Sequence, residues 1–358
     1  MPYPFGNDPA KTDGYRRFWA RKSVRRPLVG FSLKTWFPMF EFAASRAWLG
    51  HEWLTLDMIH PEQFIEDQER LLREGESIED DIIRGASPSQ AVQWLNPILG
   101  APLRILEEST LAPDQALSWQ EIGELRLDPD NPWLAKYLEF VRVLVTASQG
   151  RYPVGHGTLV GPSDVAATLR GHSNMIADLY DAPERLLRLF WQAQEVFRQV
   201  QDMVWTIAPP WHGGYFDAQY SLWCPAPTVR MQEDATGLLS PRLYRELLQP
   251  ADREWARHYP CAFIHLHSTS MFVLEEMLEI TEIAAFQVNL DVSGPPLERM
   301  LPFYRRIQEA GRPLLIRASF APDELRLLLD SLSPRGLYLY IMVQDMGEIE
   351  ALQRAAIP

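Results

Sequence analysis

The chain has 358 residues, of which 46% are hydrophobic and 23% charged, and its formal net charge is −13. This composition is typical of a globular protein, and the acidic balance disfavours a protein that binds the phosphates of nucleic acid. The two cysteines, Cys224 and Cys261, form no CxxC pair, which argues against a disulfide framework and favours a cytoplasmic location. No apolar run reaches about 18 residues, and no charged segment followed by an apolar one opens the sequence. We therefore predict neither a transmembrane helix nor a secretory signal.

Residues 1–26 are predicted to form an N-terminal arm and a helix. Basic side chains are concentrated in residues 11–26. Such a patch can bind an anion, but it is more often the solvated face of a helix. We favour the second interpretation, in which Tyr15, Phe18 and Trp19 pack inward.

The rest of the chain, residues 27–358, is predicted to form one α/β domain, a (β/α)8 TIM barrel. Strand-like segments alternate with helical patterns, which is typical of βαβ units and a parallel sheet. Eight such strands favour a closed barrel over an open sheet. Residues 101–150 fit no simple βα unit and are predicted to be an insertion with a short hairpin and a helix around 133–148. The predicted strands are 28–34, 90–95, 153–160, 228–234, 261–267, 284–291, 313–319 and 336–344.

Polar side chains occupy one face of nearly every predicted strand. A strand alternates its side chains between two faces, and the apolar face of a barrel strand must pack on the outer helices. The polar residues must then face the barrel axis, mostly near the carboxyl ends of the strands, where barrel enzymes have their active sites. This pattern favours an enzyme over a polar network that only stabilises the barrel. The predicted inward-facing residues include Ser32, Lys34, His156, Thr158, Arg230, Gln232, Asp234, Phe263, His265, His267, Gln287, Asn289, Asp291, Arg317, Tyr338, Tyr340 and Gln344.

His265 and His267 are separated by one residue on a predicted strand, so both imidazoles project to the same side. They could bind one metal ion, and a catalytic zinc site needs three protein ligands and an open position. The alternative is that the two imidazoles serve in hydrogen bonding or proton transfer. The candidates for a third ligand are Glu233, Asp234, Asp291 and Gln344, and their spacing selects none of them.

The segment from residue 205 to residue 227 is long, aromatic and rich in proline and glycine. Aromatic side chains of this kind can form one wall of a ligand site. We expect the segment to cover the barrel mouth, with Trp211, Tyr220 or Trp223 facing the ligand. The alternative is that it packs on the outer helices or in a subunit interface.

Several short motifs, in the order and spacing found here, resemble the uroporphyrinogen decarboxylase superfamily, which also includes corrinoid and coenzyme M methyltransferases. The resemblance runs from about residue 27 to the C-terminus. It implies a (β/α)8 barrel with its site at the carboxyl ends of the strands. The motifs are GTLVGPSDVAATLRG (157–171), DAPERLLRLFW (181–191), DATGLLSPRLYRELLQP (234–250), IHLH (264–267), FQVNLD (286–291) and QDMGE (344–348).

The sequence departs from this family at residues that carry its chemistry. The true decarboxylases have two arginines in the loop after the first strand, whereas this loop reads SLKTWFPMF and contains Lys34 and Trp36. The methyltransferases bind zinc through HxC and a later cysteine. Here the motif is His265-Leu266-His267, and no cysteine follows Cys261. These departures argue against authentic uroporphyrinogen decarboxylation and against zinc bound by thiolates.

We therefore predict a uroporphyrinogen-decarboxylase-like barrel enzyme that acts on a small, partly apolar substrate by methyl transfer or decarboxylation. The alternative is a barrel that binds a small ligand or a corrinoid protein without catalysis. A divalent metal such as zinc, held by His265 and His267, is a candidate cofactor. A corrinoid protein and a second copy of the chain are candidate partners, and we expect neither nucleic acid nor a membrane. The predicted catalytic residues are His265, His267, Asp291, Asp234 and Arg317, and the predicted substrate-binding residues are Lys34, Trp36, His156, Trp223, Asn289, Tyr340 and Gln344.

Overall fold

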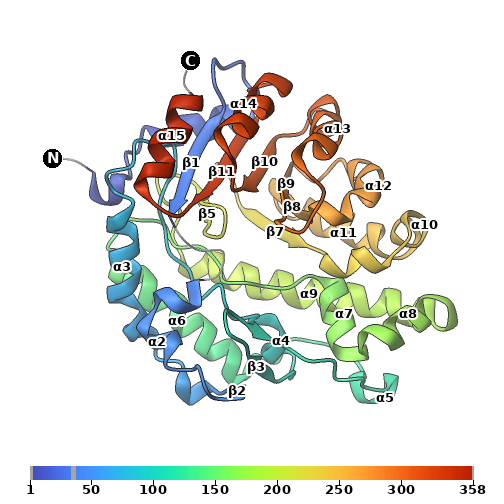
Figure 1. Ribbon diagram of the computed structural model, residues 1–358. Helices are drawn as coiled ribbons and strands as arrows, with labels where there is room; N and C mark the ends of the chain where they lie inside the picture. The colour runs from blue at the N-terminus through green and yellow to red at the C-terminus, as the bar shows by residue number, and fades with distance from the viewer. Residues whose placement is uncertain (1–2, 34–37, 357–358) are drawn as a thin grey trace.

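The computed structural model describes residues 3–33 and 38–356. Among these residues, six parallel strands form one sheet in the order β1-β11-β10-β9-β8-β7 (Figure 1). Strands β7 to β11 follow one another in chain order, and β1 pairs with β11, as the first and last strands of a (β/α)8 barrel do. The strands are β1 (Leu28–Leu33), β7 (Thr228–Gln232), β8 (Cys261–His267), β9 (Ala285–Asn289), β10 (Leu314–Ala318) and β11 (Leu337–Val343).

Helices α11 to α15 alternate with the later strands and cover the outer side of the sheet, and α9 packs on α11 beyond β7 (Figure 1). The longer helices are α1 (Lys11–Trp19), α3 (Ile65–Glu74), α6 (Pro132–Ser148), α7 (Pro162–Arg170), α8 (His172–Asp181), α9 (Pro183–Ile207), α11 (Gln249–Arg257), α13 (Leu297–Glu309), α14 (Pro322–Ser331) and α15 (Met346–Ala356). The short ones are α2 (Ala43–Arg46), α4 (Leu95–Ile98), α5 (Trp119–Ile122), α10 (Pro241–Leu243) and α12 (Leu274–Leu278). Two 3-10 helices, η5 (Asp234–Leu238) and η7 (Ser268–Val273), follow β7 and β8.

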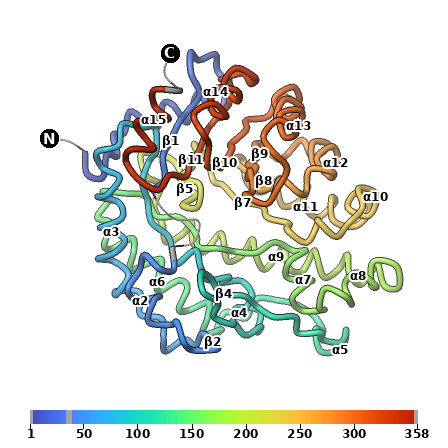
Figure 2. The backbone as a smooth tube through the Cα atoms, in the orientation of Figure 1, coloured from blue at the N-terminus to red at the C-terminus, as the bar shows by residue number. Residues whose placement is uncertain are grey.

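Residues 101–150 contain the hairpin and the helix that the sequence indicates. Strands β3 (Leu103–Ile105) and β4 (Thr110–Leu111) are antiparallel, and β2 (Trp53–Leu54) extends their small sheet. Helix α6 follows, with Asn131 as its N-cap: the Asn131 side chain accepts from two backbone N–H groups of the first turn. The tube in Figure 2 shows this region below the main sheet.

Two of the eight predicted strands are wrong. Residues 90–95 and 153–160 form no ladder, and α4 begins at the end of the first segment. The two segments nevertheless lie side by side, because Trp94 N donates to Thr158 O at 3.0 Å. The predicted parallel α/β architecture is thus present. Among the described residues the six-stranded sheet does not close into a barrel, and irregular chain occupies the place of the second and third strands.

Close packing of the backbone explains why the second segment pairs so little. In the second segment, a Cβ on Gly155 would lie 2.4 Å from the carbonyl oxygen of Phe216. The backbone at Gly155 therefore packs directly on the chain around Phe216. An isolated parallel bridge joins Val154 to Ala86, which lies before the first segment.

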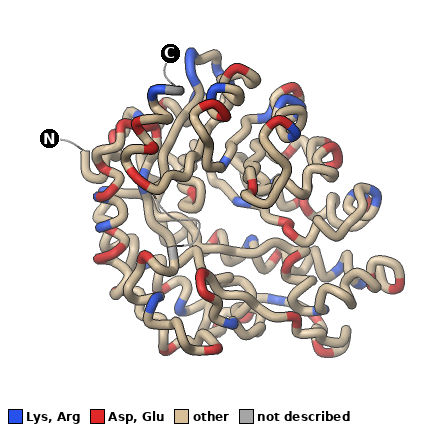
Figure 3. Tube along the Cα trace, viewed as in Figure 1, with Lys and Arg blue, Asp and Glu red and all other residues tan. Residues whose placement is uncertain are grey.

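The predicted alternation of the strands between an outer and an inner face is present in all six. Outward-facing residues such as Ile264, Val288 and Ile316 belong to the large core beneath the helices. Inward-facing residues such as Phe263 and Tyr338 belong to a second apolar cluster inside the curve of the sheet. Charged residues lie mostly on the helices and loops outside this arrangement (Figure 3). The inner face also carries polar side chains, which the next subsection describes.

The segment 205–227 does not cover the mouth, so that prediction is wrong. Its hairpin, β5 (Tyr215–Asp217) and β6 (Leu222–Cys224), packs inside the sheet against α1. Trp223 is fully buried there, its Nε1 donates to Trp211 O, and Trp19 Nε1 donates to Trp223 O. Burial against the inward-facing side of α1 gives these indoles both apolar contacts and hydrogen-bond acceptors, which a solvent-facing lid would not provide.

Across residues 3–33 and 38–356, no helix combines the length and the apolar character needed to cross a membrane. Two of the predicted substrate-binding residues, Lys34 and Trp36, lie outside the described residues.

Candidate metal centre

Three side chains that can bind a metal ion meet at the carboxyl ends of β7 and β8. Asp234 is the first residue of η5, directly beyond β7, and His265 and His267 lie on β8. The Oδ1 atom of Asp234 is 3.9 Å from His265 Nε2 and 3.8 Å from His267 Nε2. One ligand atom from each residue lies within 4.8 Å of the other two. The HxH spacing therefore does place both imidazoles on one side of the strand, where they share a carboxylate.

His267 is held by Asp291, which follows β9. His267 Nδ1 is 2.9 Å from Asp291 Oδ1, and Asp291 Oδ2 accepts from the backbone N–H and the hydroxyl of Ser268 at 2.8 and 2.7 Å. Burial alone would raise the pKa of Asp291, but the hydrogen bonds from His267 and Ser268 lower it to about 2. The ionised carboxylate can only accept, so His267 Nδ1 carries the proton and donates it. The Nε2 atom then faces Asp234. The hydrogen bond with Asp291 raises the pKa of His267 above its usual value.

His265 lies deeper and is held in the same way by an amide. Its Nδ1 contacts Gln287 Oε1 and lies 2.9 Å from the hydroxyl of Tyr220. Gln287 Nε2 donates to Asn289 Oδ1 at 2.9 Å, which orients the amide so that Oε1 faces the imidazole. His265 Nδ1 therefore donates, and Nε2 again faces Asp234. Burial lowers the pKa of His265 to about 4, so its imidazole is neutral at neutral pH, the form that binds metal ions.

Asp234 is the exposed member of the centre. Its Oδ2 accepts from Gln232 Nε2 at 2.7 Å, and its backbone N–H donates to Asp164 Oδ2 at 3.3 Å. Asp164 also accepts from Ala235 N at 2.9 Å, so this carboxylate fixes the first turn of η5. Burial, followed by the charge of Asp234, raises the pKa of Asp164.

The donor set of two imidazoles and one carboxylate fits a divalent metal ion. Catalytic zinc sites have three such protein ligands and leave one position open, and a partner that binds the second nitrogen of each histidine is their usual accompaniment. Of the sequence candidates for the third ligand, only Asp234 lies at the centre. Asp291 binds the back of His267 instead, and Glu233 is buried, with its Oε2 accepting from Ser163 N at 2.8 Å.

The predicted residues Asn289, Arg317 and Tyr340 lie on the same inner face as the histidines. The sheet register pairs His267 with Asn289, Asn289 with Arg317, and Arg317 with Tyr340. These four side chains thus form a row across β8, β9, β10 and β11, with His267 at one end. All but His267 are buried.

Three predicted substrate-binding residues do not reach the centre. His156 is buried in a charge cluster, with Nε2 3.2 Å from Asp217 Oδ2, and Arg230 Nη1 lies 3.3 Å from the same oxygen. Trp223 packs beneath α1, as described above. Gln344 is exposed beyond β11, where its backbone N–H donates to Glu348 at 2.6 Å. Gln344 lies just after the end of β11 at Val343, and His156 and Trp223 belong to the packed interior.

Tyr220 is the contact that sequence reasoning placed incorrectly. It was expected on a lid over the mouth, yet its hydroxyl reaches His265 from the amino-terminal side of the sheet. Its backbone oxygen accepts from the hydroxyl of Tyr338, on the first half of β11, at 3.1 Å. The sequence could have identified Gln287 as a neighbour of the histidines, because strand alternation places its side chain on the same face as theirs. It could not have identified Tyr220, because the position of Tyr220 depends on the fold of the β5–β6 hairpin.

Comparison with known proteins gives the fold. No protein-family model matches the sequence, and a search of curated proteins found no match. Among solved structures, a methyltransferase from Methanosarcina mazei is similar over 97% of this chain and 97% of that chain, with a TM-score of 0.63 and a sequence identity of 13%. At this identity the likeness shows a shared fold.

Proposed function

We propose that this protein is a divalent-metal-dependent methyltransferase that acts on a small, partly apolar substrate, and that it is a divergent member of the uroporphyrinogen decarboxylase superfamily. The observation that carries the proposal is the meeting of Asp234, His265 and His267, each histidine with its second nitrogen hydrogen-bonded. The fold shared with a methyltransferase and the sequence resemblance favour methyl transfer over decarboxylation.

Each side chain of the centre has a proposed role. Asp234, His265 and His267 would hold the metal ion, which would lower the pKa of a thiol or hydroxyl acceptor and stabilise the resulting anion. Asp291 and Gln287 each accept from the Nδ1 atom of one histidine and so aim both Nε2 atoms at Asp234. Beside them, the Asn289 amide and the Arg317 guanidinium offer hydrogen-bond donors for the rest of the substrate.

The proposed reaction is a displacement at the methyl carbon. The acceptor loses its proton to solvent on the open side of the centre, where Asp234 is exposed. The acceptor's sulfur or oxygen then attacks the methyl carbon, and the bond between that carbon and the donor breaks with its electron pair remaining on the donor. Following the sequence resemblance, the proposed donor is a methylated corrinoid.

Metal analysis combined with a transfer assay tests the proposal. The purified protein is stripped with a chelator, dialysed against zinc or cobalt(II), and analysed for bound metal. We expect one ion per chain in the wild type and less than a tenth of that in His265→Ala and His267→Ala. His258→Ala is the matched control, because His258 is a surface histidine outside the centre.

Transfer is measured with methylcobalamin as donor and a panel of small thiols and alcohols as acceptors. We expect metal-dependent loss of the methyl–cobalt absorbance in the wild type and in His258→Ala, and none in the two histidine variants. A protein that binds no metal, or whose transfer is unaffected by both histidine substitutions, would overturn the proposal. Metal binding without transfer to any acceptor would favour a ligand-binding barrel instead.

A further inference from the structure

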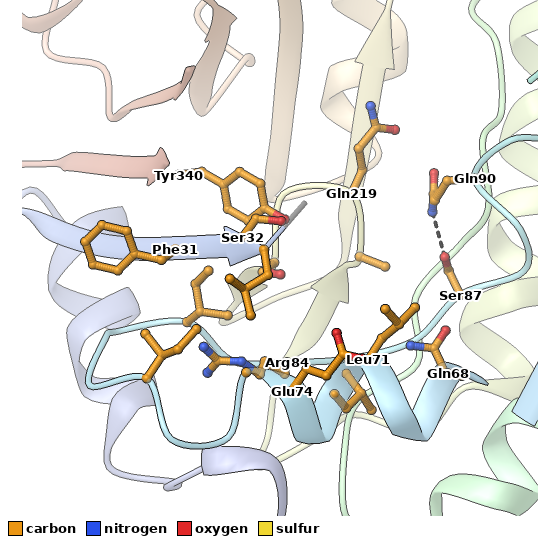
Figure 4. Close-up of a pocket in the computed structure, with 18 of the residues that line it drawn as sticks. Phe31, Ser32, Gln68, Leu71, Glu74, Arg84, Ser87, Gln90, Gln219 and Tyr340 are labelled. Atoms are coloured by element: carbon orange, nitrogen blue, oxygen red, sulfur yellow. Dashed lines mark hydrogen bonds between the residues drawn. The ribbon is translucent and has the colours of Figure 1, made fainter. Parts of the chain in front are cut away.

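Two cavities lie beside β1, one toward each end of the strand. The cavity drawn in Figure 4 has a volume of about 210 Å³ and is lined in part by Ser32 and Leu33, at the carboxyl end of the strand. The other has a volume of about 340 Å³ and lies at Leu28, between the connection from α1 to β1 and the turn that precedes β11. Because the strands are parallel, this second cavity lies at their amino ends, whereas the metal centre lies at their carboxyl ends.

Arginine side chains line the second cavity in excess of acidic ones. Arg17, Arg25 and Arg26 contribute to its wall, and of the described residues there only Asp81 is acidic. Asp81 is already matched, because its Oδ1 accepts from Arg26 Nη2 at 3.0 Å. Arg17 and Arg25 are exposed, and in the described part of the chain neither lies within ion-pair distance of a carboxylate. The cavity therefore presents two guanidinium groups that no described carboxylate neutralises.

Further positive charge lies at the rim of this cavity. Arg21 packs on Gly336, which also lines the cavity: a Cβ on Gly336 would lie 2.8 Å from Arg21 Cγ. The Arg21 side chain is held there, because its Nη2 donates to Gln308 O at 2.9 Å. Burial, followed by the charge of Arg335 in the same turn, lowers the pKa of Arg21. The two cations repel each other, and an anion bound beside them would relieve this repulsion.

Arg21 occupies a backbone position at which helices usually have glycine. At the end of α1, the N–H of Arg21 donates to Phe18 O at 3.0 Å, and the next N–H, that of Lys22, donates to Arg17 O at 2.9 Å. These two bonds form a Schellman motif, in which the residue at the place of Arg21 is left-handed, here with a φ of 46°. Arginine in this conformation costs free energy that glycine would not. The chain thus keeps a guanidinium at the rim of the cavity in spite of a backbone cost.

Charge and size together indicate which class of ligand the cavity fits. A guanidinium matches a phosphate with two parallel hydrogen bonds, and several cations in one place favour an anion with several charges. Engineered cavities of about 150 Å³ bind benzene, so a volume of about 340 Å³ admits a molecule about twice that size. The arginines surround a hollow, which a small molecule can enter and a broad acidic protein surface cannot. Val24, Pro27 and Leu28 add apolar wall on which an organic part can pack.

We propose that this cavity binds a small molecule that carries two or more linked phosphate groups. Arg17 and Arg25 bind the phosphates, and Arg21 and Arg335 add attraction from the rim. The site uses the basic segment 11–26, for which the sequence left open both an anion site and a solvated helix face. Strand β11 has 7 residues, so its two ends are about 20 Å apart. The ligand is therefore distinct from the substrate of the metal centre, and the inference does not depend on the proposed reaction.

Calorimetric titration of the purified full chain tests the proposal. The probes are inorganic phosphate, pyrophosphate, triphosphate and ATP, and hexaglutamate serves as a polyanion without phosphate. Excess chelator in the buffer prevents the probes from binding through a metal ion. We expect triphosphate to bind at least about tenfold more tightly than phosphate, with an affinity that falls as the salt concentration rises. Tighter binding of ATP than of triphosphate would identify a nucleotide as the ligand, and the reverse would identify an inorganic polyphosphate.

Three variants locate the site. Arg17→Gln and Arg25→Gln should each weaken triphosphate binding by about tenfold and leave the melting temperature unchanged, because both side chains are exposed. Arg142→Gln is the matched control, because Arg142 is an exposed arginine on α6, away from the cavity, and it should bind triphosphate as the wild type does. His267→Ala should also bind triphosphate as the wild type does, because His267 lies at the other end of the sheet.

Four results would overturn the proposal. The first is that neither pyrophosphate, triphosphate nor ATP binds. The second is that triphosphate binds as weakly as phosphate, or no more tightly than hexaglutamate, which would point to an acidic protein partner instead. The third is that binding survives both Arg17→Gln and Arg25→Gln. The fourth is that binding is lost in His267→Ala, which would place the phosphates at the metal centre.

Discussion

Replacing Asp291 with asparagine tests whether the metal centre depends on the residue behind its ligand. The substitution keeps the shape of the side chain and removes its charge. An asparagine oxygen can still accept from His267 Nδ1 at the 2.9 Å position, but its NH₂ group then faces the backbone N–H and hydroxyl of Ser268, which now donate to Asp291. One donor therefore opposes another, and His267 loses its ionised partner.

The expected loss of interaction energy follows from the loss of the Asp291 charge. The pKa of Asp291 is about 2, against an ordinary value of 3.8. At about 1.36 kcal/mol per pKa unit this difference corresponds to about 2.4 kcal/mol of interaction with the carboxylate. The side chain is 24% exposed, so solvent screening reduces that figure, and about 1–2 kcal/mol is expected. The loss of metal affinity should be 10- to 100-fold, the usual effect of removing such a partner.

Competition with a chelator of known affinity measures the zinc dissociation constant, and thermal unfolding of the metal-free protein measures stability. Asp323→Asn is the matched control, because Asp323 is exposed and pairs with Arg326 at 2.8 Å far from the centre. We expect the control to match the wild type in both measurements. If Asp291→Asn binds zinc within twofold of the wild type, the role of Asp291 in aiming His267 is refuted.

Three further substitutions test the interior. Tyr220→Phe removes the hydroxyl beside His265. It should weaken zinc binding several-fold in the chelator competition, with little change in melting temperature. An unchanged zinc affinity would show that this contact is incidental. Burial raises the pKa of Asp252 from 3.8 to about 7. Between these pH values the folded state keeps a proton that the unfolded state releases. The free energy of unfolding should therefore fall by up to about 4 kcal/mol as pH rises from about 4 to about 7. Asp252→Asn should flatten this dependence in urea unfolding across that pH range, and an identical slope in both proteins would contradict the assignment. Trp223→Ala should lower the free energy of unfolding by about 3–5 kcal/mol in the same assay, because the indole is fully buried and donates to Trp211 O. A decrease of less than about 1 kcal/mol would argue against the place of Trp223 in the packed interior.

The sequence by itself determined which side chains face inward on the observed strands. A strand alternates its side chains strictly, so the apolar residues Ile264 and Val288 required His265, His267 and Gln287 to share the opposite face. The same rule placed both imidazoles on one side without any knowledge of their neighbours. These inferences needed only local geometry, which does not depend on what the rest of the chain does.

Only the tertiary structure decided which partners these residues meet. Asp234 comes within reach of both histidines because Asp164, from another helix, holds the first turn of η5. Tyr220 reaches His265 because its hairpin finds more burial against α1 than it would over the mouth. These contacts depend on which distant parts of the chain gain the most burial and hydrogen bonding when they pack together. The periodicity of the sequence reports only local geometry and does not predict that packing.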